Sequence, residues 1–573
     1  MSSAPLVSIR QLKVTFQMEG ETVTAVNGIS LDIRPGEVLG IVGESGSGKS
    51  VTAMSLMRLI QAPGTIAGGS ILYQPPGQPA TDLAKAMPAQ MRAYRGSEIA
   101  MIFQEPMTSL NPLHTCGNQV AEAIRLHKKV TRRQAKKQTI ALFERVRIPH
   151  PERTFDKYPH ELSGGQKQRV MIAMAISCGP RLLIADEPTT ALDVTVQKTI
   201  LELLLELQRE MGMSVVFITH DLGVMAEIAT RVAVMYKGSI VEEGPVQQIF
   251  NNPRHPYTRG LLACRPPLEK RLRRLPVVSD FMDTDTGVAE FVNSLELPET
   301  DILAREAALA ERPPLLKVEG LSTWFPLRRN LVGKVQEWAK AVDDVSFEVR
   351  EGETLGLVGE SGCGKTTLSR TLLRLIEPTG GRIWYKGKDL RSLSPAEMRE
   401  MRRHIQLIFQ DPYSSLNPRL TAGQAILEPM RVHGLYGGDA QRKAKVMELL
   451  EKVNLLPEHY HRYPHEFSGG QRQRIVIARA LAVNPEFIIC DESVSALDVS
   501  VQAQVLNLLV QLQQEFNFTY IFISHNLSVV HFMSDRMMVM NKGKIEEIGV
   551  ARKVYHHPAS GYTRQLIAAI PGR

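Results

Sequence analysis

The sequence predicts an α/β protein built from two tandem copies of one domain. One set of motifs occurs twice in the same order, and the second copy of four of them lies 305 or 306 residues after the first. These pairs are Gln104 and Gln410, Ser163 and Ser468, Glu187 and Glu492, and His220 and His525. Such self-similarity indicates a duplication. We expect the first domain at 1–265, a linker at 266–314 and the second domain at 315–573.

Short apolar runs alternate with helical patterns inside each copy. The runs at 37–42, 181–185 and 487–490 are typical of buried parallel strands. Leucines spaced by three and four residues predict helices at 196–211 and 501–516. This alternation predicts an α/β core with a parallel sheet. The stretches between Gln and SGGQ, 104–163 and 410–468, are mainly helical in pattern and predict a helical subdomain inserted into each core.

The predicted linker changes in character along its length. It begins with the basic run 270–274, turns acidic, and closes on Pro313 and Pro314. Thr300 could cap a short helix that ends at Glu311. For the rest we expect partial order. The basic run has two interpretations, a solvated stretch or a face toward a membrane or another subunit.

Composition excludes several classes of protein. The hydrophobic fraction is 43% and the charged fraction 22%, as in ordinary globular chains. No apolar run approaches the ~18 residues that cross a bilayer, and the N-terminus lacks a signal-peptide pattern. The five cysteines form no CxxC pair, which suits a reducing cytosol. The net charge of +8 is spread among acids, so we expect no nucleic-acid partner.

Two glycine-rich loops each join a predicted strand to a predicted helix. Both fit the phosphate-cradle pattern GxxxxGK[ST], at 43–50 and 359–366, in which backbone amides and a helix N-terminus converge on phosphates. The lysines are expected to contact the β- and γ-phosphates of ATP, and the following hydroxyl residues to bind Mg²⁺. The predicted nucleotide-binding residues here are Gly43, Ser45, Gly46, Gly48, Lys49, Ser50 and Val51, and Gly359, Ser361, Gly362, Gly364, Lys365, Thr366 and Thr367.

Polar residues after other apolar runs add the groups that hydrolysis needs. An Asp ends one strand and can hold Mg²⁺, and the Glu after it can polarise the attacking water. A His after the next strand is either a plain loop residue or a γ-phosphate contact, and its place in both copies favours the contact. A loop Gln either satisfies backbone groups or links Mg²⁺ and water to the helical subdomain. These residues are Asp186, Glu187, His220 and Gln104, and Asp491, Glu492, His525 and Gln410.

A second glycine-rich motif, SGGQ, precedes a helix in each copy. It consists of Ser163, Gly164, Gly165 and Gln166, and of Ser468, Gly469, Gly470 and Gln471. A second anion site per domain makes sense if two domains face each other and each caps the other's nucleotide. Here the chain resembles the ATP-binding cassette family over both halves, including the D-loops at 191–193 and 496–498. One departure is Phe467, where the family usually has Leu.

That resemblance implies a fold and a pair of composite sites. Each domain would be a RecA-like α/β core with an inserted helical subdomain and an antiparallel β part. The halves would form an intramolecular head-to-tail ATP sandwich, in which Ser468 and Gly470 complete the first P-loop site and Ser163 and Gly165 the second. An aromatic residue would stack on adenine. In the first domain Phe16 fits, whereas in the second Trp324 and Phe325 compete.

Further motifs resemble the ATPase subunits of oligopeptide, dipeptide and nickel importers. The tail NPRHPYTR at 252–259 is typical of that group, and 557–564 carries a disturbed copy, HPASGYTR. Fused two-cassette members of the group include glutathione importers. The resemblance implies two permease subunits, an extracytoplasmic binding protein, and a peripheral place on the cytoplasmic face of the cell's inner membrane. Only Cys264 follows the first tail, so we expect no iron–sulphur cluster.

Transport coupling is expected in the loops after the glutamines, at 105–112 and 411–418.

A second interpretation of the whole chain competes with the importer. It is a soluble twin-cassette ATPase that acts on ribosomes or nucleic acid. Those relatives have long charged helices as linkers, and the prolines of this linker argue against one. The cargo is chosen by other chains, so the sequence leaves it open among glutathione, dipeptides and oligopeptides.

Overall fold

The computed structural model describes residues 4–18, 20–104, 109–189, 192–283, 287–329 and 335–570. The chain forms two compact units. The first holds the described residues within 1–262 and 278–285, and the second those within 263–277 and 286–571. The segment predicted as a linker is thus divided between the units and does not stand apart from them.

The first unit contains two sheets. An antiparallel sheet has the order β2-β1-β4-β5, and a six-stranded sheet has the order β10-β9-β3-β8-β7-β6. Within the larger sheet every neighbouring pair is parallel except β9 with β10. The strands are β1 (Val7–Met18), β2 (Glu21–Ile33), β3 (Val38–Val42), β4 (Gly64–Tyr73), β5 (Thr81–Asp82), β6 (Ile99–Ile102), β7 (Leu182–Asp186), β8 (Ser214–Ile218), β9 (Arg231–Tyr236) and β10 (Ser239–Pro245).

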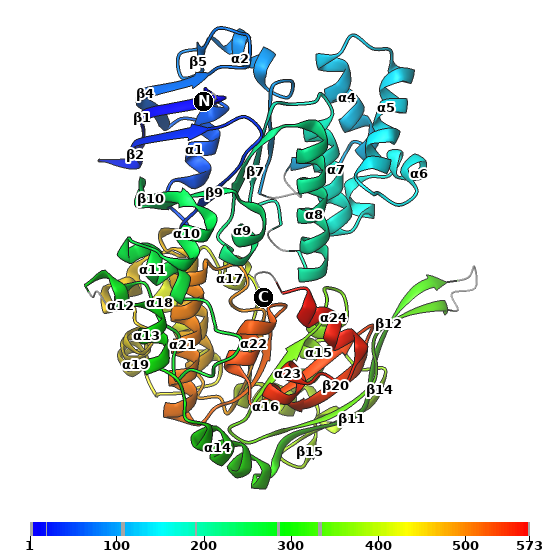
Figure 1. Cartoon of the computed structure of the whole chain (residues 1–573). Coiled ribbons are helices and arrows are strands. Elements are labelled where there is room, and N and C mark those ends of the chain that lie inside the picture. The colour runs from blue at the N-terminus through cyan, green and yellow to red at the C-terminus, as the bar shows by residue number, and fades with distance from the viewer. Residues whose placement is uncertain are drawn as a thin grey trace. The chain divides into compact units, whose positions relative to one another are not determined.

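Four helices of the first unit form the predicted helical subdomain. These helices, α4 to α7, pack together and are drawn beside β7 in Figure 1. The helices are α1 (Lys49–Leu56), α2 (Pro88–Tyr94), α4 (Cys116–His127), α5 (Arg132–Arg145), α6 (Pro151–Phe155), α7 (Gly164–Ile176), α8 (Val194–Met211), α9 (Leu222–Ile228), α10 (Val246–Asn251), α11 (Pro256–Ala263), α12 (Ser279–Met282) and the 3₁₀ turn Pro159–Glu161.

The second unit repeats this plan. Its antiparallel sheet has the order β12-β11-β14-β15 and its larger sheet the order β16-β17-β18-β13-β19-β20. The strands are β11 (Pro314–Arg329), β12 (Val335–Arg350), β13 (Thr354–Val358), β14 (Gly380–Tyr385), β15 (Lys388–Asp389), β16 (Ile405–Ile408), β17 (Phe487–Asp491), β18 (Thr519–Ile523), β19 (Arg536–Asn541) and β20 (Lys544–Val550).

The helices of the second unit follow the same order after two additional ones, α13 and α14. They are α13 (Val288–Ser294), α14 (Glu299–Glu311), α15 (Lys365–Leu372), α16 (Pro395–His404), α17 (Pro412–Ser415), α18 (Ala422–Val432), α19 (Asp439–Lys452), α20 (Gly469–Leu481), α21 (Val499–Phe516), α22 (Leu527–Met533), α23 (Ala551–His556) and α24 (Gly561–Ala568). The 3₁₀ turns are Leu390–Ser392, Pro457–His461 and Pro464–Glu466. The two α/β domains of the predicted fold class are confirmed.

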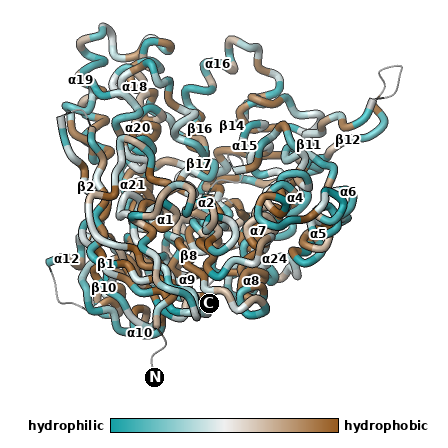
Figure 2. The backbone as a smooth tube through the Cα atoms, turned by 90° about the horizontal axis from the view of Figure 1, so that it is seen from above, coloured by the Kyte–Doolittle hydropathy of each residue, from teal (hydrophilic) through white to brown (hydrophobic). Residues whose placement is uncertain are grey.

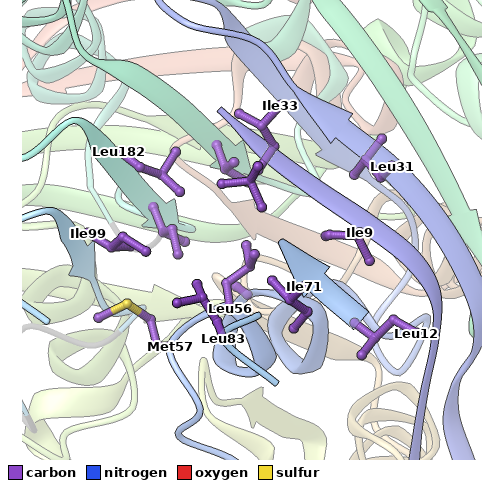
Figure 3. Packing of buried hydrophobic residues seen from close by; sticks show 14 of the residues in the cluster. Ile9, Leu12, Leu31, Ile33, Leu56, Met57, Ile71, Leu83, Ile99 and Leu182 are labelled. Atoms are coloured by element: carbon purple, nitrogen blue, oxygen red, sulfur yellow. The ribbon is translucent and has the colours of Figure 1, made fainter. Parts of the chain in front are cut away.

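One hydrophobic core joins the two sheets of the first unit. Figure 3 shows Ile9 and Ile71 of the antiparallel sheet close to Leu56 of α1, with Leu182 of the parallel sheet nearby. All five residues of β3, β7 and β8 are buried. Each such aliphatic side chain contributes about 1.5–3 kcal/mol on burial. In Figure 2 the tube is mostly hydrophobic around β8 and mostly hydrophilic along α6, as this core requires.

The predicted linker is more ordered than expected. The expected helix is present as α14, but it begins at Glu299 after Pro298, so Thr300 does not cap it. Pro298 takes the N-cap position with φ of −56° and ψ of 142°, while Thr300 lies inside the first turn and its hydroxyl donates to Asp301 Oδ1 at 3.5 Å. Leu275 exchanges two backbone hydrogen bonds with the side chain of Asn507 on α21, at 2.7 and 2.8 Å. Long-range contacts of this kind order the segment.

Candidate nucleotide-binding sites

The first P-loop lies between β3 and α1, and its glycines are required by close backbone approaches. A Cβ on Gly43 would lie 2.2 Å from the Met235 carbonyl oxygen, and one on Gly48, whose φ is 102°, would lie 2.5 Å from that of Ala25. Only glycine avoids both the clash and the strained φ. The second P-loop, between β13 and α15, repeats both approaches at 2.2 and 2.0 Å. Each unit therefore has a strand–loop–helix segment whose backbone depends on the glycines of the predicted phosphate-cradle pattern.

Each P-loop lysine is buried inside its own loop. Lys49 Nζ donates to the carbonyls of Gly43 and Glu44, both at 2.8 Å, and Lys365 Nζ donates to those of Gly359 and Glu360 at 2.8 and 2.9 Å. A buried ammonium needs such acceptors. Phosphate oxygens are stronger acceptors than carbonyls, because hydrogen bonds to charged groups are shorter and stronger. The lysines are thus held where a phosphate could attract them.

Two of the three residues predicted for Mg²⁺ lie together in each unit, whereas Gln104 and Gln410 bond to Glu187 and Glu492. Ser50 Oγ donates to Asp186 Oδ1 at 3.1 Å, and Thr366 Oγ1 to Asp491 Oδ1 at 3.4 Å. Burial raises the pKa of Asp186 to about 6, and it also raises the pKa of Asp491. A buried carboxylate with a raised pKa is a group that a cation would stabilise in its ionised form. The donor set of hydroxyl and carboxylate oxygens is of the type that Mg²⁺ prefers.

The predicted catalytic glutamates form a hydrogen-bonded cluster with the loop glutamine and the histidine. In the first unit Glu187 Oε2 accepts from Gln104 Nε2 at 3.0 Å and lies 3.2 Å from His220 Nδ1. In the second unit Glu492 Oε2 accepts from Gln410 Nε2 at 2.9 Å and lies 3.5 Å from His525 Nδ1. The structure therefore brings the three motifs of each set to one carboxylate.

The environment of Glu492 favours its ionised form. Burial raises the pKa of this carboxyl, but the hydrogen bond from His525 and the charge of Lys365, 3.9 Å away, outweigh burial and leave the pKa below its usual value. An ionised carboxylate can accept a proton from water. Glu492 is therefore ionised at neutral pH, which is the form that a proton acceptor needs.

Sequence reasoning missed the backbone strain at both glutamates. Glu187 and Glu492 each have φ of 48°, in the left-handed region that non-glycine residues rarely adopt. Such a conformation costs on the order of 1 kcal/mol and persists where the surroundings hold it. The Glu187 amide donates to the Ile218 carbonyl at 2.9 Å, and the Glu492 amide to that of Ile523 at 3.0 Å. Each strained residue directly follows the end of a strand, β7 or β17, and no sequence signal marks the strain.

The SGGQ motifs form capping boxes at the N-termini of α7 and α20. Ser163 Oγ accepts from the Gln166 amide, while Gln166 Oε1 accepts from the Ser163 amide. Ser468 and Gln471 repeat this pair. The second glycine of each motif is needed for packing, since a Cβ on Gly165 would lie 2.7 Å from Val196 Cγ1, and one on Gly470 2.2 Å from Val501 Cγ1. The motif thus sets the N-terminus of a 13-residue helix, the end of a helix at which anions bind.

Sheet register distinguishes the two candidate aromatic residues of the second unit. Val14 pairs with Val26 in the first unit, and Thr323 pairs with Val342 in the second. Two residues further along these strands lie Phe16 and Phe325, so Phe325 occupies the place of Phe16. Trp324 occupies the place of Thr15, and Lys340 Nζ already lies 4.4 Å from the centre of its ring.

Some predicted features fall outside the described residues. Residues 105–108 of the first expected coupling loop and Ala191 of the first D-loop are among them. Asp193 and Asp498, the last residues of the D-loops, are the N-caps of α8 and α21. In the second coupling loop, Asp411 caps α17 by accepting from the amides of Tyr413 and Ser414.

Comparison with known proteins identifies the family. The family model described as ABC transporter matches residues 26–190 and 342–495, more than half of the chain. The chain belongs to the ATP-binding cassette transporter family. A second model, described as oligopeptide/dipeptide transporter, C-terminal region, matches residues 241–283 and includes the first tail. As a member of this family, the chain is an ATPase coupled to transport.

Full-length relatives are also found. Proteins named glutathione import ATP-binding protein GsiA from Escherichia coli K12 and Shigella sonnei are 51% identical over 578 residues, covering all of this chain and 90% of theirs. Among solved structures, a dimeric ATP-binding cassette bound to ADP and Pi is 28% identical, with a TM-score of 0.38, covering 41% of this chain and 99% of its own. Within the described ranges, no helix has the length and apolar character needed to cross a membrane.

Proposed function

We propose that this chain hydrolyses ATP at two sites to drive import of small peptides, with glutathione the first candidate. The observation that carries the proposal is the 51% identity over the full chain to glutathione import ATP-binding proteins. The intact Gln, Glu and His cluster in each unit supports it, because neither site lacks a group needed for hydrolysis.

In the proposed reaction each unit binds the phosphates of ATP through its P-loop amides and lysine. Lys49 and Lys365 exchange their loop carbonyls for β- and γ-phosphate oxygens. Glu187 and Glu492 accept a proton from the attacking water, while Gln104 and Gln410 orient that water. His220 and His525 hold the γ-phosphate. Mg²⁺, held by Ser50, Asp186 and Gln104 or by Thr366, Asp491 and Gln410, would neutralise charge on the phosphates.

We assign the remaining contacts of each ATP to the opposite unit. Ser468 and Gly470 would complete the site of Lys49, and Ser163 and Gly165 that of Lys365, in a head-to-tail sandwich. The position of each motif at the N-terminus of a helix, α7 or α20, supports this role. Adenine stacks on Phe16 in one site. In the other we choose Phe325 over Trp324, because it occupies the position of Phe16.

The partners follow from the family. We propose that permease subunits supply the transport path, as expected of an import ATPase of this family, and that this chain lies beside them on the cytoplasmic face of the inner membrane. An extracytoplasmic binding protein would deliver the peptide. A twin-cassette ATPase of ribosomes is the alternative, and no described feature favours it.

Reconstitution tests this proposal. The chain would be purified with the permeases that co-purify with it and placed in liposomes with ATP inside. Uptake of labelled glutathione and of a dipeptide panel would be measured with the binding protein outside. We expect peptide uptake to require ATP, and we expect the transported peptide to stimulate ATP hydrolysis. Absence of any peptide uptake, together with ATPase stimulation by ribosomes or RNA, would overturn the proposal.

A further inference from the structure

The tail motif of each unit reaches back to its own P-loop. The Glu44 amide of the first P-loop donates to the hydroxyl of Tyr257, in the HPYTR tail, at 3.0 Å. In the second unit the Glu360 amide donates to the hydroxyl of Tyr562 at 3.2 Å. These partners are 213 and 202 residues apart in sequence. Because both units have this hydrogen bond, it is a shared structural feature of the two copies.

We propose that Tyr257 and Tyr562 are positioning residues for ATP binding, which act by holding the base of each P-loop. Glu44 is bonded on both sides of its backbone, since its amide donates to Tyr257 and its carbonyl accepts from Lys49 Nζ at 2.8 Å. Glu360 has the same two bonds, to Tyr562 and Lys365. The tyrosine therefore fixes the residue on which the phosphate-binding lysine rests.

Hydrogen bonds to a strand fix the position of the tail and therefore of its tyrosine. Glu242 of β10 accepts from the amides of Arg254 and His255 at 2.9 and 3.1 Å. The Tyr257 amide then donates to His255 Nδ1 at 3.1 Å, which starts α11 in a defined direction. All of these hydrogen bonds lie within the first unit. Together they connect β10 to the tail and the tail to the P-loop.

The second tail keeps this anchor with different residues. Glu547 of β20 accepts from the amides of Ala559 and Ser560 at 2.9 and 3.1 Å. The Tyr562 amide donates to Ser560 Oγ at 3.2 Å, so the serine replaces His255 as the acceptor. The copy that looks disturbed in sequence is therefore equivalent in its contacts. What the two tails share is the glutamate clamp, the capping acceptor and the tyrosine.

The two sites differ in how tightly the tyrosine is held. Tyr257 is fully buried and stacks on Tyr236 with ring centres 4.2 Å apart. Tyr562 is only partly buried, and Asn541 stands where the first unit has Tyr236. An amide left without its partner costs more when water cannot replace that partner. We therefore expect a larger effect at the first site.

Tyrosine-to-phenylalanine variants test the proposal, because they remove the hydroxyl and keep the ring. Tyr257→Phe would be made in the full chain with Lys365→Ala, so that only the first site reports, and Tyr562→Phe with Lys49→Ala. ATP affinity would be measured with a fluorescent ATP analogue. We expect Kd to rise about five- to ten-fold for Tyr257→Phe and about two- to three-fold for Tyr562→Phe, from the worth of one hydrogen bond.

Steady-state kinetics and a matched control separate positioning from stability. The P-loop binds the phosphates in the ground state and in the transition state alike, so KM should rise with kcat nearly unchanged. Tyr73→Phe and Tyr385→Phe also remove a hydrogen-bonded hydroxyl, from bonds to Glu98 and Glu486 away from the P-loops. These controls should lower Tm while leaving Kd unchanged. An unaltered Kd in Tyr257→Phe, or an equal rise of Kd in Tyr73→Phe, would overturn the proposal.

Discussion

Replacement of Asp535 with Ala should release α14 from the second unit. The Asp535 carboxylate is 4% exposed and accepts from Arg305 Nε at 2.7 Å, from Arg271 Nη2 at 3.1 Å and from the Thr354 amide at 3.0 Å. Both arginines come from the segment predicted as a linker. The first unit has Thr230 at the corresponding position, where the hydroxyl donates to the Val38 carbonyl at 2.9 Å. The charge at 535 is thus particular to the unit that holds Arg271 and Arg305.

The free-energy cost of the Asp535→Ala substitution follows from the burial of the ion pairs. Removing one partner of a buried ion pair costs about 3–5 kcal/mol, because the other charge is left unpaired. The side chains of Arg305 and Arg271 are 44% and 19% exposed, so solvent screening reduces the loss. We expect about 2–3 kcal/mol in the local opening free energy of α14. That corresponds to a roughly 30- to 150-fold loss of amide protection.

Hydrogen–deuterium exchange of peptides covering 271–275 and 299–311 measures this loss directly. Thr230→Ala is the matched control and should leave the exchange of these peptides unchanged.

The pH dependence follows from the pKa of Asp535. Burial raises this pKa, but the hydrogen bonds and charges of Arg305 and Arg271 outweigh burial and lower it. A lowered folded-state pKa means that the stabilisation is fully present above the unfolded value, ~3.9, and is lost as pH falls through the folded value. Protection should therefore be constant between about pH 6 and 8. Unchanged exchange of α14 in Asp535→Ala would refute the reasoning.

Two further predictions concern the ATP sites. Glu187→Gln and Glu492→Gln should each leave ATP binding intact and lower kcat of their own site about 10²- to 10⁴-fold, since the water loses its base, and a double variant with near wild-type turnover would contradict this assignment. For the head-to-tail arrangement, Ser163→Cys should form a disulfide with Cys363 in the nucleotide state that closes the units, once the other native cysteines are replaced. Ser468→Cys should instead pair with a Ser47→Cys, and its capture of Cys363 would show that each half completes its own site.

Sequence by itself determined the duplication and the α/β class, and it supplied the prediction of the catalytic groups. The P-loops, the Asp-Glu pairs and the histidines are short motifs beside strands, and their chemistry depends on residue type and local spacing. β3, β7 and α8 lie within two residues of their predicted ranges, because a buried strand or an amphipathic helix leaves a local apolar pattern. These features need no knowledge of distant contacts.

Tertiary structure decided the rest, because it depends on contacts between distant residues. The order of the predicted linker comes from Asn507 and Asp535, more than 200 residues away in sequence. The choice of Phe325 over Trp324 as the counterpart of Phe16 rests on sheet register, and the left-handed turn at Glu187 on a bond to Ile218. The tail that marked the family in sequence acquired a physical role only when Tyr257 was found against Glu44. Local patterns carry no information on such pairings, since each is specified by packing of the whole unit.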